Sequence, residues 1–221
     1  GHIVTVTVST SIINLNLNST TSKLIINNSQ ILTITGAFLN SGTTTNGVNG
    51  PGTLLFTGTA SFGVLTPTGV LPNVVVGNGA SNNTVTVGVS TSLNNLNVNI
   101  GATISLGTRT LTINGFFTNN GVVTGTSGRL TTFTGASTNN GSINLTSGRI
   151  TLTTGSFTNN GSISMLTGRL IQTTGSIINS ATGTISFSGT GTITFGTGNF
   201  INLNTSASAT FGSSAITITG T

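Results

Sequence analysis

Four consecutive stretches decide the fold: GFFTNNGVVTGTSGRLTTFT (residues 115–134), GASTNNGSINLTSGRITLTT (135–154), GSFTNNGSISMLTGRLIQTT (155–174) and GSIINSATGTISFSGTGTIT (175–194). The first three keep Asn-Asn-Gly and Arg at the same places, and the fourth is more divergent. Each stretch begins directly after the one before it and has the same length, so the period is constant. Self-similarity at a constant period is the signature of a repeat architecture.

Strand and turn signals alternate within one repeat, as residues 155–174 illustrate. Phe157 lies in a short expected strand, and Asn159-Asn160-Gly161 predicts a turn, because Asn and Gly tolerate the left-handed conformations of tight turns. Ile163 and Met165 alternate with polar residues on a second strand. A Thr-Gly pair then predicts another turn, and Leu170 begins a third strand.

One such repeat cannot bury its apolar residues alone, whereas stacked repeats bury Phe on Phe and Ile on Ile and close backbone ladders along one axis. We therefore predict an all-β chain folded as a β-solenoid (β-helix) of about 20-residue rungs, with roughly 11 rungs in the 221 residues. Asn side chains in one column can form a hydrogen-bonded ladder. A β-sandwich is the alternative, but the constant spacing of Asn-Asn-Gly and Arg favours the solenoid. The residues expected to point inward are Phe117, Ile143, Phe157, Ile163 and Leu170.

A longer repeat contains the short one. Residues 4–11 match residues 85–92, and residues 31–38 match residues 110–117. These matches divide a single solenoid, residues 1–221, into similar modules at 1–80 and 81–160, followed by further degraded rungs at 161–221. All three prolines (Pro51, Pro67 and Pro72) fall in residues 51–80, where we expect loops or a bulge-rich rung, because proline is excluded from central strands.

The composition argues against catalysis and metal binding. The chain has no Asp, Glu or Cys, and its one His is His2. General acid–base catalysis and activated nucleophiles need a titratable base, for which only His2 and Lys23 are available, with no carboxylate to orient either. Glycoside hydrolysis normally uses two carboxylates, and the chain has none. Zinc and calcium sites need thiolate, imidazole or carboxylate ligands. We therefore expect no enzyme activity, no catalytic or metal-binding residues and no cofactor.

Binding of nucleic acid and spanning of a membrane are also not expected. The formal net charge is +5 over 221 residues, with no Tyr or Trp to stack on bases. No apolar run approaches the roughly 18 residues of a transmembrane helix, so we do not expect the chain to span a membrane.

Four arginines form the one patterned set of charges: Arg109, Arg129, Arg149 and Arg169. Because their spacing equals the repeat period, they are expected in one column of the solenoid. Such a column could bind an anionic cell-surface polysaccharide, a lipopolysaccharide or a nucleic acid. The interpretation we favour is a solvated turn column that keeps the rod soluble beside aggregation-prone strands.

Thr-x-Thr pairs suggest an ice-binding face, which would need threonine in the same columns of successive rungs. By the constant period, the columns of Thr151 and Thr153 hold Leu111 and Ile113 two rungs earlier. The array is then broken, and the threonines are better explained by their preference for strands.

The segment LNNLNVNIGATISLGTRTLTINGFFTNNGVVTGTSGRLTTFTG (residues 93–135) resembles the β-strand-repeat surface proteins of Bacteroidetes-type bacteria. Residues 97–107, 111–120 and 129–135 carry the resemblance, and related patterns occur in filamentous-haemagglutinin-like adhesins. The resemblance implies secretion, an extracellular or cell-surface location, and a role as a stalk, adhesin or matrix protein.

The two ends of the solenoid suggest a function. The first expected strand, residues 3–8, and the last, residues 215–219, are uncharged and strongly β-prone, with no visible cap. Contact between unlike ends does not close on itself and generates filaments. We therefore expect an extracellular fibre subunit that partners with itself head to tail. The alternatives are a fragment of an adhesin stalk and a polysaccharide- or ice-binding solenoid. The assembly contact is expected to bury alternate apolar side chains at the two ends: Val4, Val6, Val8, Ile216 and Ile218.

Overall fold

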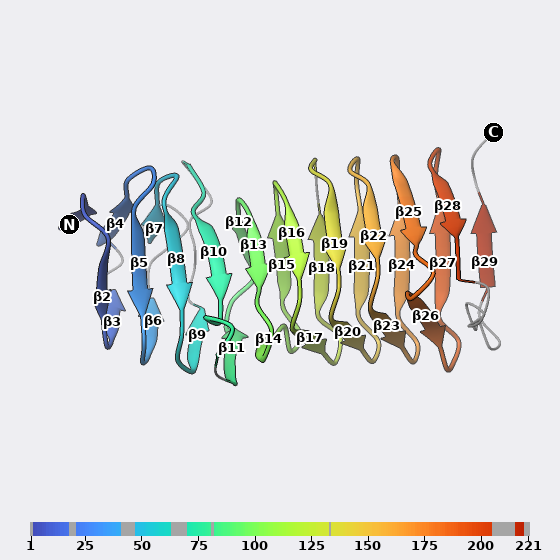
Figure 1. Ribbon diagram of the computed structural model, residues 1–221, viewed down its shortest axis with the longest axis horizontal. Coiled ribbons are helices and arrows are strands. Elements are labelled where there is room, and N and C mark those ends of the chain that lie inside the picture. Colours follow the sequence, from blue (N-terminus) through green and yellow to red (C-terminus); the bar gives the residue numbers. More distant parts are fainter. Residues whose placement is uncertain are drawn as a thin grey trace.

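The computed structural model describes residues 2–17, 21–40, 47–62, 70–80, 82–132, 134–204 and 215–218. Within these ranges the regular structure consists of strands, without a helix, and every strand pairing is parallel. The strands stack along one axis as a β-solenoid (Figure 1). The predicted fold is confirmed, and the alternative of a β-sandwich is wrong.

A turn whose strands are all described places one strand on each of three faces. The first face is a single ten-stranded sheet that runs the length of the molecule (Figure 1). Its strands, in order, are β2 (Thr10–Ile12), β5 (Ile31–Ile34), β8 (Thr53–Phe56), β10 (Asn73–Val76), β13 (Leu96–Val98), β16 (Phe117–Asn119), β19 (Ser137–Asn139), β22 (Phe157–Asn159), β25 (Ser176–Asn179) and β28 (Asn199–Asn202).

The second face follows the first along the chain. It contains the pair β3 (Leu15–Leu17) and β6 (Phe38–Asn40), and then the seven-stranded sheet of β9 (Ala60–Phe62), β11 (Asn83–Val87), β14 (Ala102–Ser105), β17 (Val122–Gly125), β20 (Ser142–Leu145), β23 (Ser162–Met165) and β26 (Thr184–Phe187).

The third face completes each turn. Its seven-stranded sheet comprises β12 (Thr91–Leu93), β15 (Thr110–Ile113), β18 (Arg129–Thr132), β21 (Arg149–Leu152), β24 (Arg169–Gln172), β27 (Thr192–Phe195) and β29 (Ala215–Ile218). In the first turns the corresponding place in chain order is held by β1 (Ile3–Val6), β4 (Lys23–Ile26) and β7 (Val48–Asn49).

The solenoid has about nine turns rather than the predicted eleven. The constant step holds where it was measured, as in Arg129, Arg149 and Arg169. Other turns contain more residues, as shown by paired strand residues that are more than 20 positions apart in the sequence. Examples are the pairing of Leu32 with Leu54 and that of Ile177 with Phe200. Corners of variable length take up the extra residues, so fewer turns fit into the chain.

Alternate strand residues point inward and form columns along the axis. The five predicted core residues are confirmed, each at most 1% exposed. Ile143, Ile163 and Ile185 are successive partners on the second face, so Ile does stack on Ile. In the corresponding column of the first face, Phe does not stack on Phe, because Ser137 lies between Phe117 and Phe157. The Oγ of Ser137 accepts a hydrogen bond from the backbone N–H of Phe117.

The first Asn of each Asn-Asn-Gly was predicted to lie in a turn, and this prediction is wrong. Asn119, Asn139 and Asn159 are the last residues of their strands, and their side chains are fully buried. The Nδ2 of Asn119 donates to Oδ1 of Asn139, and that of Asn139 donates to Oδ1 of Asn159, both at 2.7 Å. The predicted ladder exists, and it continues through Asn179 to Asn202. We call these five residues the inner asparagine ladder.

The inner ladder also joins the first and second faces at the corner between them. Each Nδ2 has a second hydrogen, and those of Asn119 and Asn139 donate to the backbone carbonyls of Ser142 and Ser162 at 3.1 Å. Both carbonyls belong to the first residue of a strand of the second face in the following turn. The ladder therefore satisfies the buried amide groups of Asn139 and Asn159, whereas Oδ1 of Asn119, at the start of the ladder, accepts no hydrogen bond from the described residues. The ladder also fixes where the chain passes from one face to the next.

The second Asn of the motif forms an outer ladder at the surface. Asn140 donates from Nδ2 to Oδ1 of Asn120, and Asn160 donates to Asn140, at 2.8 Å. The glycine that follows is required by close approach of the backbones. A Cβ at Gly141 would lie 2.0 Å from the carbonyl oxygen of Gly121 in the preceding turn.

The prolines fall where loops were expected. Pro51 lies in a bend before β8, and Pro72 immediately precedes β10. Pro67 lies outside the described residues.

Candidate functional site

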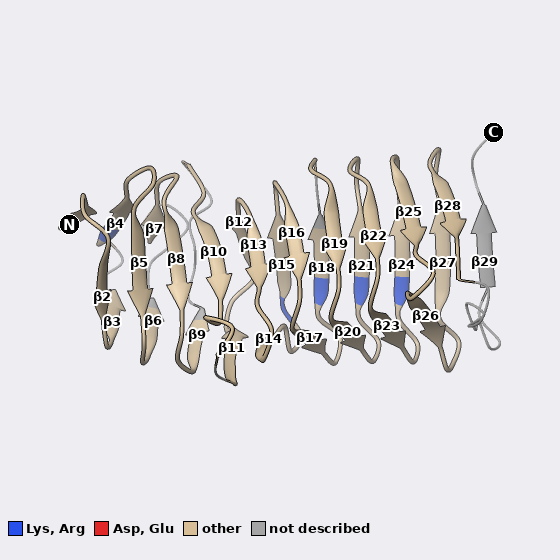
Figure 2. Ribbon diagram, viewed as in Figure 1, with Lys and Arg blue, Asp and Glu red and all other residues tan. Residues whose placement is uncertain are grey.

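Three of the four arginines form a column on the third face. Arg129, Arg149 and Arg169 are the first residues of β18, β21 and β24, and they are mutual partners in register. Figure 2 shows them as three adjacent blue segments. They begin strands, whereas a turn column was predicted.

Arg109 does not belong to this column. The residue paired with Arg129 is Thr110, so Arg109 lies one position earlier, just before β15. The step from β15 to β18 is one residue shorter than the constant period that suggested the alignment. Arg109 contacts the column through its backbone carbonyl, which accepts a hydrogen bond from the N–H of Arg129 at 2.8 Å.

A polar groove lies beside the three aligned arginines, and we call it the arginine groove. Its other lining residues are Ser127, Ser147, Gly148 and Thr167. Ser127, Ser147 and Thr167 each lie two residues before an arginine, so the groove has a column of hydroxyls next to a column of guanidinium groups. Arg129 and Arg169 are exposed, and Arg149 is partly buried between them.

The arginine groove is electrostatically unbalanced. The chain contains no Asp or Glu, so no carboxylate side chain can neutralise the three cations. Like charges directly opposite each other in a sheet are destabilising. The groove therefore presents positive charge and hydroxyls that can serve an external anion.

No family model, curated protein or solved structure matches this chain. The resemblance to β-strand-repeat surface proteins remains a prediction from the motifs of residues 93–135.

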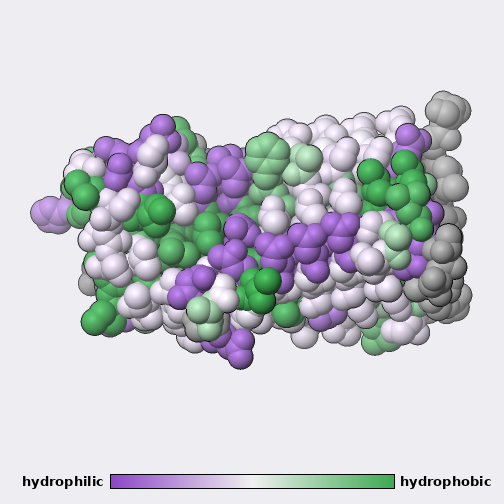
Figure 3. All heavy atoms as spheres, in the orientation of Figure 1, coloured by the Kyte–Doolittle hydropathy of each residue, from purple (hydrophilic) through white to green (hydrophobic). Residues whose placement is uncertain are grey.

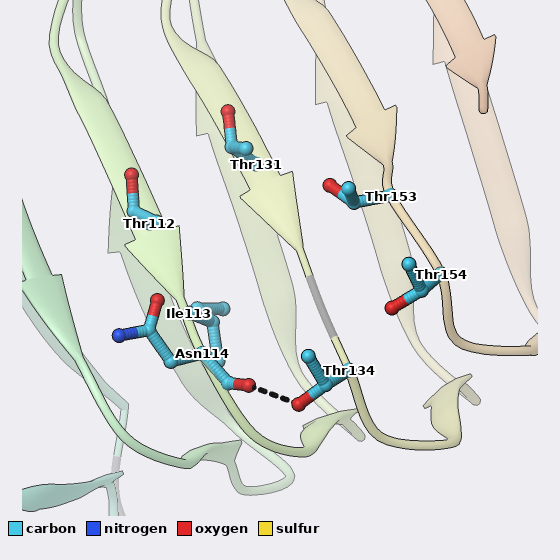
Figure 4. Close-up of a pocket in the computed structure, with 7 residues that line it drawn as sticks. All are labelled: Thr112, Ile113, Asn114, Thr131, Thr134, Thr153 and Thr154. Atoms are coloured by element: carbon cyan, nitrogen blue, oxygen red, sulfur yellow. Dashed lines mark hydrogen bonds between the residues drawn. The ribbon is translucent and has the colours of Figure 1, made fainter. Parts of the chain in front are cut away.

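A second groove on the third face is lined mostly by threonine: its residues are Thr112, Ile113, Asn114, Thr131, Thr134, Thr153 and Thr154 (Figure 4). The hydroxyl of Thr134 donates to the backbone carbonyl of Asn114 at 2.7 Å. The labelled threonine hydroxyls point in different directions (Figure 4). No side chain of this groove is charged, so nothing in it can act as an acid, a base or an ionic anchor.

The threonine columns of this face differ from the sequence-based alignment. Thr112, Thr131 and Thr151 are successive partners, whereas Leu111 pairs with Leu130 and points inward. The prediction that Leu111 shares a column with Thr151 is wrong, for the same one-residue reason as for Arg109. The corrected column is still interrupted, because Ile171 follows Thr151.

The second face carries two outward columns rich in hydroxyls. One contains Ser142, Ser162 and Thr184 after Val122, and the other contains Asn144, Ser164 and Ser186 after Thr124. From β20 to β26 these two columns are polar, and the described strands of this face contain no charged residue. It offers hydrogen bonds over several turns, without a feature that selects one ligand.

The amino-terminal end exposes the interior of the solenoid. Val4 pairs with Leu24 and lies on the same side of its strand, yet Val4 is 56% exposed and Leu24 is 2% exposed. Val6, in contrast, is already buried against Ile26, and Val8 is exposed beyond the end of β1. Val4 is therefore the uncovered end of an interior column.

The carboxy-terminal end is described in part. β28 and β29 are the last strands of the first and third faces. In β28, Phe200 is half-buried over Ile177 and packs against Phe195, with 5.3 Å between ring centroids. Ile216 and Ile218, predicted to form the assembly contact, belong to β29, and the structure describes their strand but not their side chains. Figure 3 shows hydrophobic side chains toward both ends of one face and a hydrophilic band between them.

The described part of the chain contains no group of three metal-ligating side chains. It also contains no helix long and apolar enough to cross a bilayer.

Proposed function

We propose that this chain is a structural protein of an extracellular fibre, whose copies stack head to tail by adding strand to strand at the solenoid ends. The observation that supports this most directly is the exposure of Val4 above the buried Leu24. An interior column that ends in water loses apolar burial, and another rung placed on it restores that burial.

The strand edges support the same proposal. β1, β2 and β3 are each at the end of their sheets, and β28 ends the ten-stranded sheet at the other side. Within the described residues, β1 pairs with β4 alone, so its outer edge presents unpaired N–H and C=O groups. A parallel edge strand can satisfy these groups, and contact between unlike ends repeats without closing.

The chemistry of the ends limits how assembly is directed. Because no carboxylate side chain exists in the chain, no side-chain salt bridge can hold the contact together. Backbone hydrogen bonds and apolar packing remain, so assembly is expected to depend weakly on salt.

A second proposal is that the described rungs are part of a longer adhesin stalk, in which rungs of the same polypeptide cover the ends. The open strand edges of the first turn fit this equally well. The two proposals differ in whether the chain itself polymerises.

Changing Val4 to Lys is expected to abolish filament growth, because the lysine would place a charge over the open end of the core. The unmodified chain should form filaments whose mean length grows with concentration. Negative-stain electron microscopy shows whether filaments form, and sedimentation velocity measures how their size changes with concentration. The matched control is Thr5→Lys, which adds the same charge one residue away on the outward side of β1, where Thr5 is exposed.

Filaments in the Thr5→Lys variant and none in Val4→Lys would support end-to-end stacking. An unmodified chain that stays monomeric at high concentration would eliminate the fibre proposal in favour of the stalk. Equal loss of filaments in both variants would show that added charge, rather than the open core, prevents assembly.

A further inference from the structure

The arginine groove carries charge at a regular spacing along the solenoid axis. Arg129, Arg149 and Arg169 belong to adjacent parallel strands, which lie about 4.8 Å apart in a β-sheet. Thr110 precedes the three arginines in the column and Thr192 follows them, so the charged stretch spans three turns. An extended molecule with several anionic groups matches this regular spacing.

The neighbouring hydroxyls add a second, neutral set of contacts. The Oγ of Ser147 donates to the backbone carbonyl of Thr126 at 3.0 Å, which leaves its oxygen free to accept a hydrogen bond. Ser127 and Thr167 hold the equivalent places one turn to either side. The groove thus pairs cationic donors with acceptors in each of three consecutive turns.

We propose that the arginine groove binds an acidic polysaccharide that lies along the solenoid axis. Carboxylate or sulfate groups would meet successive guanidinium groups, which form paired hydrogen bonds with such planar or multi-oxygen anions. Sugar hydroxyls would donate to Ser127, Ser147 and Thr167. The ligand would supply the counter-charge that the chain, without Asp or Glu, lacks.

A nucleic acid would also supply negative charge, but the groove lacks the features that bases need. Proteins that bind single strands combine cations with aromatic side chains on which bases stack. The lining of the arginine groove contains Ser, Thr, Gly and Arg, with no aromatic residue. Hydroxyls and guanidinium groups match a polymer of acidic sugars better.

The test compares two variants that lose the same charge. Arg149→Gln removes the central guanidinium of the groove, whereas Arg109→Gln removes one that lies out of register with the column. Binding of the intact chain to polygalacturonate is measured by calorimetry at low salt, with dextran as the neutral polymer and oligo(dT) as the nucleic acid. Arg149→Gln should weaken binding about tenfold or more, because hydrogen bonds to charged groups are the strong ones. Arg109→Gln should change it less than about twofold.

Arg149→Lys separates charge from geometry. Lysine keeps the charge but cannot form the paired hydrogen bonds of a guanidinium group, so the variant should fall between the unmodified chain and Arg149→Gln. Should Arg149→Gln fail to give a β-type circular dichroism spectrum, Arg129→Gln at an exposed position replaces it.

Equal effects of Arg149→Gln and Arg109→Gln would overturn the proposal, because net charge alone would then explain binding. Absence of binding to polygalacturonate at low salt would also overturn it, as would tighter binding of oligo(dT). The groove is present in every copy of the chain, so these outcomes do not depend on whether copies stack into fibres.

Discussion

Replacing Asn139 by aspartate is expected to lower the free energy of unfolding by about 3–5 kcal/mol at pH 7, as for an uncompensated buried charge. Asn139 is fully buried. Its Oδ1 accepts from Asn119 at 2.7 Å, and its Nδ2 donates to Asn159 and to the carbonyl of Ser162. A carboxylate can accept the bond from Asn119, but it has no hydrogen to donate to Oδ1 of Asn159 or to the carbonyl oxygen of Ser162. Its negative charge would then face these two oxygens directly.

The loss of stability in Asn139→Asp should depend on pH. The unmodified chain has no side-chain carboxylate, so the introduced carboxyl is the one acidic side chain that can cause this dependence. Burial and the two facing oxygens raise the pKa of the introduced carboxyl in the folded state above its unfolded value of about 3.9. Below that unfolded value the group is neutral in both states, and the variant keeps most of its stability. Stability should then fall as pH rises toward the folded-state pKa. Urea denaturation at pH 3 and pH 7 measures the difference.

Asn140→Asp is the matched control, since the same substitution is made one residue along in the outer ladder. Asn140 is exposed, and its hydrogen bonds to Asn120 and Asn160 lie at the surface. Its cost should stay below about 1 kcal/mol, with little pH dependence. If the two variants lose equal stability, the inner asparagine ladder does not stabilise the solenoid in the way its geometry suggests.

The repeat of residues 115–194 was sufficient to predict the solenoid and its core, because alternation and a constant step constrain both. The inner ladder was only half predicted. Asn and Gly are typical of turns, so the motif indicated a corner, but it did not show that the first Asn points inward. The recurrence of two adjacent Asn, where one would suffice for a turn, was the available signal.

Alignment by a fixed period failed where the turns change length. Thr110 rather than Arg109 pairs with Arg129, and Thr112 rather than Leu111 leads to Thr151. A shift of one residue moves a side chain from one side of a strand to the other. The length of each corner depends on its local backbone geometry, and a single repeat period taken from the motifs does not show how this length varies from turn to turn.

The surfaces were predicted unevenly. The arginine column follows from spacing for Arg129, Arg149 and Arg169, but the hydroxyls beside it do not, because the path of the preceding corner places them there. Among the assembly residues, Val4 is exposed as expected, whereas Val6 is buried over Ile26. Both are the first members of their columns, and alternation alone cannot show which of the two is covered.

Replacing Phe157 by alanine is expected to lower the free energy of unfolding by about 3–5 kcal/mol, because it removes a fully enclosed ring from the core. Phe157 is 1% exposed, between Ser137 and Ile177 in its column. Ser137 is too small to fill the space from one side, and the fixed spacing between rungs prevents collapse from the other. Phe116→Ala is the control, since Phe116 is 56% exposed and its loss should cost below about 1 kcal/mol. Urea denaturation of both variants provides the measurement. A cost for Phe157→Ala as small as that for Phe116→Ala would mean that this column of the first face does not form the interior of the solenoid.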